Sequence, residues 1–137
     1  VIGLRDRALI GLMVYTFARV GAAAQMRLED VYVQARKTWV RLHEKGGKEH
    51  EMPCHGNLEA WLRAYIEGAS LVGGKTYLFR SAAGRTGRLT ANPMAQGDVF
   101  RMVGRRAAAV GIRTRIGCHS FRATGITEYL RNGGRLE

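Results

Sequence analysis

The His-Ser-Phe-Arg string at residues 119–122 has side chains suited to chemistry on a phosphodiester. If a helix begins at Cys118, His119 and Arg122 are three residues apart and share one face of its first turn. The free backbone N–H groups and the positive dipole end of such a turn favour a bound phosphate. An imidazole exchanges a proton near neutral pH, and a guanidinium matches two phosphate oxygens. Together with Arg19 far upstream, this string indicates a phosphate site.

A strong and uneven positive charge surrounds the string. The 137-residue chain has 22 Lys+Arg against 11 Asp+Glu, a net charge of +11. Within residues 80–122, Asp98 is the single acidic residue among nine arginines. A field of one sign indicates a polyanionic partner, most simply nucleic acid. The alternative is a set of merely solvated arginines, but solvated surfaces normally mix both signs of charge.

The length and composition predict one domain covering residues 1–137. An apolar content of 46% and only two prolines are typical of a folded chain rather than a disordered one. No apolar run approaches the ~20 residues of a membrane span, and no signal-peptide pattern is present. We therefore expect a cytoplasmic protein with no membrane partner. Both ends of the chain suggest a piece of a longer protein.

Two short motifs raise the question of a metal or nucleotide site. Cys54-His55 and Cys118-His119 are identical dipeptides, but adjacent side chains diverge, and zinc motifs space their ligands by two to four residues. We therefore expect no metal and two reduced thiols. Gly74-Lys75-Thr76 is like the end of a P-loop, yet Ala69 stands where that loop requires glycine. We expect no cofactor.

The first half of the chain alternates between a helical and a strand pattern. A nearly uniform apolar stretch predicts a buried helix over residues 4–18, followed by a short helix at 22–30. β-branched and aromatic residues predict strands at 31–33, 38–43 and 49–53. Gly46-Gly47 supplies the reversal between the last two strands, which predicts a small antiparallel sheet.

The second half is predicted to be helical. Periodicity indicates a helix from Asn57 to Gly73-Gly74, then a loop at 80–88, a helix from Thr90 to Val110 and a last helix at 118–132. In the helix from Thr90, Arg101 and Arg105 lie off the apolar stripe, so we expect both to contact DNA phosphates. The fold class is therefore mainly α with a small antiparallel β-sheet (α+β).

An ordered series of boxes resembles the catalytic domain of the tyrosine recombinases, also called phage integrases. Residues 17–23 (FARVGAA) resemble the box commonly written G-L-R-x-S-E-L, and residues 44–53 (EKGGKEHEMP) resemble the hairpin box G-K-G-x-K-E-R-x-x-P. Residues 119–127 (HSFRATGIT) resemble the box H-x-L-R-H-T-F-A-T, and residues 77–79 resemble the apolar segment between the boxes. The resemblance spans essentially the whole chain and implies the fold of the DNA breaking-rejoining enzymes.

The resemblance implies a cofactor-free reaction on double-stranded DNA through a 3′-phosphotyrosyl intermediate. Arg19 and Arg122 would stabilise the pentavalent phosphorane, and Lys45 would protonate the leaving 5′ oxygen. His119 would bind the phosphate or assist proton transfer, and Lys48 would contact DNA. Taken singly, Arg19 also fits a cation at a helix end, and the two lysines fit ordinary turn residues. Self-association on DNA, and an origin in a bacterium, phage or mobile element, are implied for the full-length protein.

The chain departs from the family pattern at several points. Ala22 stands where the family has an acidic residue, and Ala123 where it has a second histidine. The family's third box, a histidine or tryptophan, and its nucleophilic tyrosine lie farther beyond Arg122 than this chain extends; Tyr129 follows Arg122 too closely. We also expect the family's N-terminal core-binding domain to be missing from this piece of the protein. We therefore expect this fragment to bind DNA phosphate without cleaving it.

Two other functions remain open. A non-catalytic DNA-binding module derived from a recombinase is favoured by Ala22 and by the absent tyrosine. An RNA-binding protein would use the same arginines, but the aromatic residues fall on core stripes rather than on a stacking platform. A histidine or tryptophan followed by a tyrosine beyond Glu137 would favour the recombinase over the non-catalytic module.

Overall fold

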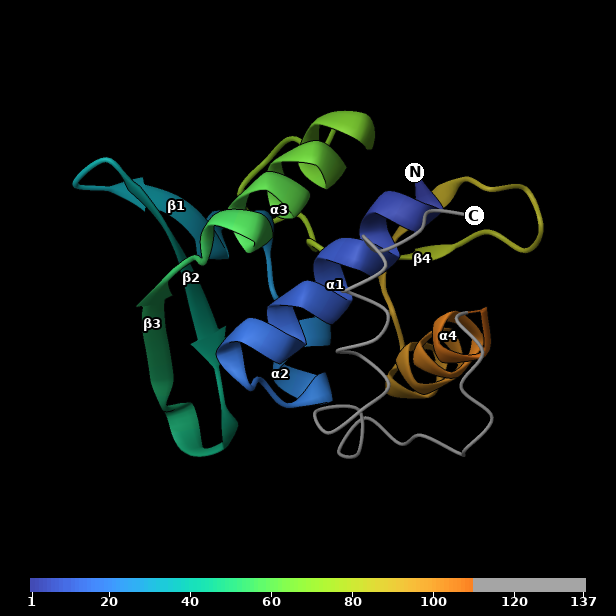
Figure 1. Cartoon of the computed structure of the whole chain (residues 1–137), viewed down its shortest axis with the longest axis horizontal. Coiled ribbons are helices and arrows are strands. Elements are labelled where there is room, and N and C mark those ends of the chain that lie inside the picture. Colours follow the sequence, from blue (N-terminus) through green and yellow to red (C-terminus); the bar gives the residue numbers. More distant parts are fainter. Residues whose placement is uncertain (110–137) are drawn as a thin grey trace.

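Helix α1 (Ile2–Thr16) runs through the middle of the molecule, between a three-stranded sheet and helix α4 (Gln96–Ala109) (Figure 1). The computed structural model describes residues 1–109. Residues on successive turns of α1 are buried, among them Leu9, Ile10 and Met13, as expected for a helix that is apolar on nearly every face. The predicted buried helix is therefore confirmed, beginning and ending two residues earlier than expected.

Helix α3 (Gly56–Gly68) packs closely on α1. A Cβ atom on Gly11 would lie 2.7 Å from Cε3 of Trp61, so only a glycine allows this approach. We predicted that this helix continues to Gly73, which was wrong. The chain leaves the helix at Ser70, which has a positive φ of 52°, and Leu71 turns back to donate its N–H to the Ile66 carbonyl at 3.0 Å. Burial of the Leu71 side chain accompanies this early ending.

The three-stranded sheet has the order β1-β2-β3 and is antiparallel, as the sequence predicts. Its strands are β1 (Val31–Gln34), β2 (Lys37–His43) and β3 (Glu49–Pro53). Alternate residues of β2, including Val40 and Leu42, enter the core. The β2–β3 reversal is confirmed at Gly46 and Gly47, whose φ angles of 79° and 75° lie in the region that favours glycine.

Two predicted segments have a different structure. Residues 80–93 form a hairpin of β4 (Arg80–Ala82) and β5 (Leu89–Pro93), where we predicted a loop and the start of a helix. Pro93 therefore ends a strand, and α4 begins only at Gln96. Pairing of Ala82 with Leu89 stabilises the hairpin, which local sequence does not reveal.

The predicted short helix at 22–30 is also divided. Helix α2 spans Val20–Ala24, and Leu28–Asp30 form a separate 3₁₀ turn. The Asp30 carboxylate accepts the Arg27 backbone N–H at 2.9 Å, which fixes Arg27 in an extended conformation between the two. The fold class, mainly α with small antiparallel sheets, is confirmed. The helix predicted at 118–132 lies outside the described residues.

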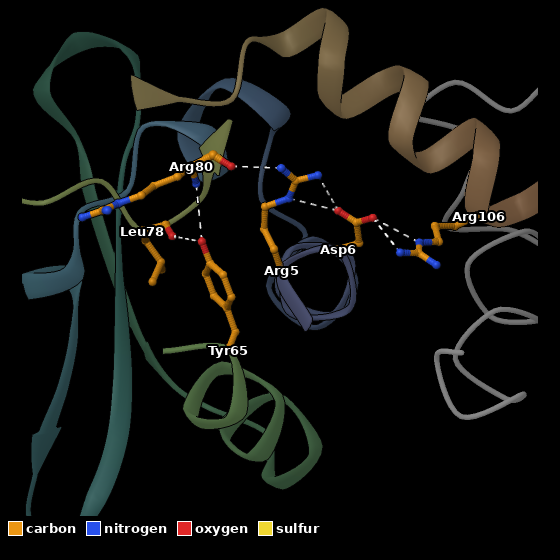
Figure 2. A network of polar contacts seen from close by, with 6 residues as sticks. All are labelled: Arg5, Asp6, Tyr65, Leu78, Arg80 and Arg106. Carbon is orange, nitrogen blue, oxygen red and sulfur yellow. Dashed lines mark hydrogen bonds and ion pairs between the residues drawn. The ribbon is translucent and has the colours of Figure 1, made fainter. Parts of the chain in front are cut away.

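A buried polar network joins α1 to α4 and to β4 (Figure 2). Asp6 lies between two arginines: its Oδ1 accepts from Arg5 Nη2 at 2.8 Å, and its Oδ2 accepts from Arg106 Nη2 at 2.9 Å. Arg5 also donates to the Arg80 carbonyl at 3.0 Å. Because Asp6 and Arg5 are buried, this network fixes the position of α4 relative to α1.

Candidate nucleic-acid interface

The connection between α1 and α2 presents Arg19 to solvent. Thr16 anchors this connection, since its Oγ1 donates to the Leu12 carbonyl at 2.6 Å and accepts the Ala18 N–H at 3.2 Å. Arg19 precedes α2 in an extended conformation, and its carbonyl accepts the Ala23 N–H at 3.0 Å. Within residues 1–109, the exposed guanidinium of Arg19 forms no hydrogen bond or ion pair. It is therefore available for an external anion.

The β2–β3 turn carries Lys45 and Lys48, both exposed. Glu44 donates its N–H to the Lys48 carbonyl at 2.8 Å and closes the turn around Lys45. Neither ammonium group has an ion-pair partner among the described residues. The turn therefore holds two exposed cations at the end of the β2–β3 hairpin, and the role of Lys45 stays a prediction.

Buried Asp30 supports the strand that leads into this turn. Its Oδ1 lies 3.0 Å from Nε2 of His43 and 3.5 Å from a guanidinium nitrogen of Arg41, both on β2. The other ring nitrogen of His43 lies 3.3 Å from the Glu49 carboxylate on β3. Sequence reasoning missed this role, because in the sequence Asp30 is one of two adjacent acidic residues, Glu29 and Asp30, with no pattern that links it to His43. The available signal was a histidine two residues before the hairpin lysine.

Helix α2 connects the two cationic elements. It packs against β2 on one side and against α4 on another. Its Gly21 is so close to α4 that a Cβ atom there would lie 3.0 Å from Nε2 of Gln96. Helix α2, which follows Arg19, thus contacts both the strand that leads into the Lys45 turn and the helix that carries Arg101 and Arg105. The structure shows no direct contact between these side chains within residues 1–109.

Helix α4 places Arg101 and Arg105 on its exposed side, away from its buried residues Val99, Met102 and Val103. Their predicted position off the apolar stripe is confirmed, and their contact with phosphate stays a prediction. Arg101 forms an ion pair with Asp98. Arg105 lines a small cavity of about 150 Å³ between α1, α4 and the β4–β5 hairpin, together with Arg5, Ser81, Ala82, Met94 and Asp98. The predicted residues His119 and Arg122 lie outside the described residues.

Each tyrosine of the described part of the chain is held by neighbouring groups. Tyr65 is fully buried and donates to the Leu78 carbonyl at 2.7 Å, and burial raises the pKa of its hydroxyl. Tyr15 stacks on the His55 ring at 4.3 Å. The rings of Tyr32 and Tyr77 lie beneath guanidinium groups, at 4.9 and 4.4 Å respectively. These four tyrosines pack against other side chains of the fold and are not exposed nucleophiles.

Residues 1–109 include no helix with the length and apolar character needed to cross a membrane. In the same part of the chain, no three His, Cys, Asp or Glu side chains gather as a metal site would require. The thiol of Cys54 is half-buried, and desolvation raises its pKa to about 11. At neutral pH this cysteine is therefore protonated and weakly nucleophilic.

A family model described as the phage integrase family matches residues 1–137, the whole chain. The chain belongs to the phage integrase family. The tyrosine recombinase XerD of Xanthomonas campestris pv. campestris is 30% identical over 146 residues, covering 98% of this chain and 42% of the relative. XerD of Staphylococcus saprophyticus is 27% identical and covers 98% of this chain and 44% of the relative. This member of the family therefore spans less than half the length of these relatives.

Solved structures of recombinases share the fold of this phage integrase family member. The crystal structure of XerA recombinase superposes with a TM-score of 0.69 at 24% identity, covering 96% of this chain and 46% of that one. XerH site-specific recombinase bound to its difH substrate superposes with a TM-score of 0.65 at 22% identity, covering 95% and 37% of the two chains. The family resemblance inferred from the boxes is confirmed.

Proposed function

We propose that this chain is the central part of the catalytic domain of a tyrosine recombinase, which cleaves and rejoins double-stranded DNA at specific sites. The observation that carries the proposal is the exposed guanidinium of Arg19, which has no partner among the described residues and stands on the element between the Lys45 hairpin and α4. Membership of the phage integrase family and relatives named tyrosine recombinase support it.

In the proposed reaction, a tyrosine hydroxyl attacks the phosphorus of one DNA strand. The tyrosine oxygen forms the 3′-phosphotyrosyl bond as its proton passes to water or to His119. The bond to the 5′ oxygen breaks, and Lys45 gives that oxygen its proton. Arg19 and Arg122 stabilise the charge of the pentavalent phosphorane, and His119 binds the same phosphate. Rejoining is the reverse attack by a 5′ hydroxyl. No step requires a metal or an organic cofactor.

We assign the nucleophile to a tyrosine beyond residue 137, so the 137-residue domain binds DNA without cleaving it. The contacts of Tyr15, Tyr32, Tyr65 and Tyr77 support this assignment, since each ring is held against its own fold. The full-length protein would add an N-terminal core-binding domain and would self-associate on DNA. The XerH and XerA chains, of which this chain covers less than half, leave room for such additions.

The test uses the full-length protein and a nicked duplex that carries its recombination site, with the covalent adduct read on a denaturing gel. We expect Arg19→Ala to abolish the adduct, because it removes charge stabilisation worth about 10²–10³ in rate. We expect Lys45→Ala to slow adduct formation, and a substrate with sulfur as the leaving atom to restore much of the rate, since that leaving group needs no proton.

Lys37 provides the matched control. It lies exposed at the end of β2 farther from the Lys45 turn, so Lys37→Ala removes the same charge from the same hairpin, away from the proposed site, and leaves adduct formation unchanged. An adduct formed by the 137-residue chain itself would contradict the assignment of the nucleophile. A full-length protein that binds the site but never forms an adduct would favour the non-catalytic DNA-binding module, which Ala22 also fits.

A further inference from the structure

The residue that ends helix α1, Phe17, has a backbone conformation that is unfavourable for a phenylalanine. Phe17 has a φ of 57° and a ψ of 26°, which is the left-handed helical region. A Cβ atom is crowded there, so helix ends usually place glycine at such a position, and a bulky residue is an outlier. Glycine is also the letter aligned with Phe17 in the first recombinase box. Strained residues of this kind cluster at functional sites.

The Phe17 side chain is also far more exposed than a phenylalanine usually is. Its exposed fraction is 65%, compared with 0% for Phe79 and 39% for Phe100. Most of the ring therefore lies outside the hydrophobic core, and burial in that core does not account for its presence. Backbone preference and core packing both favour a different residue at this position.

The short distance along the chain between Phe17 and Arg19 limits what the ring can contact. One residue, the buried Ala18, separates the two, so their Cα atoms are at most about 7.6 Å apart. Thr16 anchors the same connection through both of its hydroxyl contacts, at 2.6 and 3.2 Å. A DNA strand advances about 3.4 Å per nucleotide, so a ring at this separation reaches a nucleotide adjoining the phosphate bound by Arg19.

We propose that Phe17 is a DNA-contacting residue whose ring packs against the sugar and base of a nucleotide next to the phosphate that Arg19 binds. The inference rests on the proposed function, because it takes Arg19 as a phosphate ligand. Apolar side chains that contact bases or wedge between them are a general device of DNA-binding proteins. The unfavourable backbone at Phe17 is then the cost of holding an aromatic ring beside the phosphate site.

The test compares Phe17→Gly, Phe17→Trp and Arg19→Ala in the 137-residue chain, with duplex binding measured by fluorescence anisotropy over a range of salt concentrations. Phe17→Gly relieves the backbone and removes the ring, so we expect the Tm to rise by about 3–5 °C and the affinity to fall about fivefold or more. Phe17→Trp keeps an aromatic ring and binds within about twofold of the parent chain. Because no phosphate contact is lost, Phe17→Gly leaves the salt slope unchanged, whereas Arg19→Ala reduces it by about one.

Ala35 provides a matched control for strain relief. It is exposed in the β1–β2 turn, has a φ of 52°, and lies at the end of the sheet opposite the β2–β3 turn (Figure 1). Like Phe17→Gly, Ala35→Gly is expected to raise the Tm, but it leaves the affinity for DNA unchanged.

The outcomes separate this inference from the proposed function. If Phe17→Gly binds DNA as tightly as the parent chain while Arg19→Ala binds it more weakly, the role of Phe17 is overturned and the proposed function stays intact. A lowered Tm for Phe17→Gly also overturns it, because the ring is then a structural element. Failure of the parent chain to bind DNA, or no effect of Arg19→Ala, counts against the proposed function itself.

Discussion

Arg105 and Arg106 are neighbours on α4, yet they belong to two different regions of the molecule. Arg106 points into the protein, with a side chain only 11% exposed and two hydrogen bonds to Asp6 Oδ2 at 3.1 and 2.9 Å. Arg105 is exposed and forms no ion pair within residues 1–109. We call Arg5, Asp6, Arg80 and Arg106 the interior network, and Arg19, Lys45, Lys48, Arg101 and Arg105 the cationic surface.

The difference shows that a count of arginines overstates the charge available to a ligand. A buried guanidinium is deprived of water and must have a carboxylate or carbonyl partner, so the members of the interior network are committed to the fold. An exposed cation without such a partner exchanges water for a phosphate at little cost. Adjacent positions on one helix therefore differ in function according to the face on which they lie.

The largest effect is expected for Asp6→Ala in the interior network. Asp6 is the carboxylate shared by Arg5 and Arg106. Its removal leaves the buried Arg5 guanidinium with the Arg80 carbonyl as its hydrogen-bond partner within residues 1–109. Loss of one partner from a buried pair destabilises by about 3–5 kcal/mol. Urea unfolding followed by circular dichroism measures this change in the free energy of unfolding.

Asp98→Ala is the matched control for that variant. Asp98 also pairs with an arginine of α4, but both side chains are largely exposed, at 48% and 66%. The free energy of unfolding should therefore change by no more than about 0.5 kcal/mol. Equal losses in the two variants would remove the distinction between the two regions.

The sequence predicts those helices, strands and turns whose pattern is visible in residues close together along the chain. The apolar run of α1, the Gly46-Gly47 reversal and the three-stranded sheet were all foreseen, because periodicity and turn chemistry are visible in adjacent residues. The β4–β5 hairpin was missed because its pairing of Arg80 with Pro93 depends on contacts between segments with no strong strand pattern. The early end of α3 likewise depends on Leu71 entering the core.

For the candidate site, the sequence predicts residues but not their surroundings, and the roles of those residues stay predictions. The positions of Arg19 and Lys45 followed from the order of the boxes, and both side chains lie exposed. The support of the Lys45 hairpin by Asp30 and His43 was not visible, since thirteen residues separate the two along the chain. The hydrogen bonds between Arg106 and Asp6 were not visible in the sequence either, because the two residues are one hundred positions apart.

An intermediate effect is expected when two members of the cationic surface are removed together. The double variant Arg101→Ala/Arg105→Ala loses two proposed phosphate contacts, so its affinity for unrelated duplexes should fall by about tenfold or more at moderate salt. The slope of log K against log salt should become shallower by about two. Anisotropy titrations at several salt concentrations give both quantities, and urea unfolding checks that stability is retained.

The control for the double variant is Arg36→Ala/Arg63→Ala, which removes the same charge from the β1–β2 turn and from α3. This pair should change the affinity less than the α4 pair does. An equal loss of affinity would mean that net charge alone, rather than the cationic surface, determines binding. A loss confined to one DNA sequence would point to base contacts instead of phosphate contacts.

The smallest effect is expected for DNA binding by Asp98→Ala. The Asp98 carboxylate occupies the Arg101 guanidinium through an ion pair on the exposed side of α4, and it is the single negative charge within residues 80–109. Its removal frees Arg101 and lowers repulsion of the phosphate backbone, so the affinity for duplex DNA should rise by about two- to fivefold at low salt and the gain should shrink as salt screens the charge. Asp98→Asn should give a similar gain, because the charge rather than the shape matters. Unchanged or weaker binding by both variants would show that α4 does not face the DNA. Arg101 and Arg105 would then not belong to the DNA-binding part of the cationic surface.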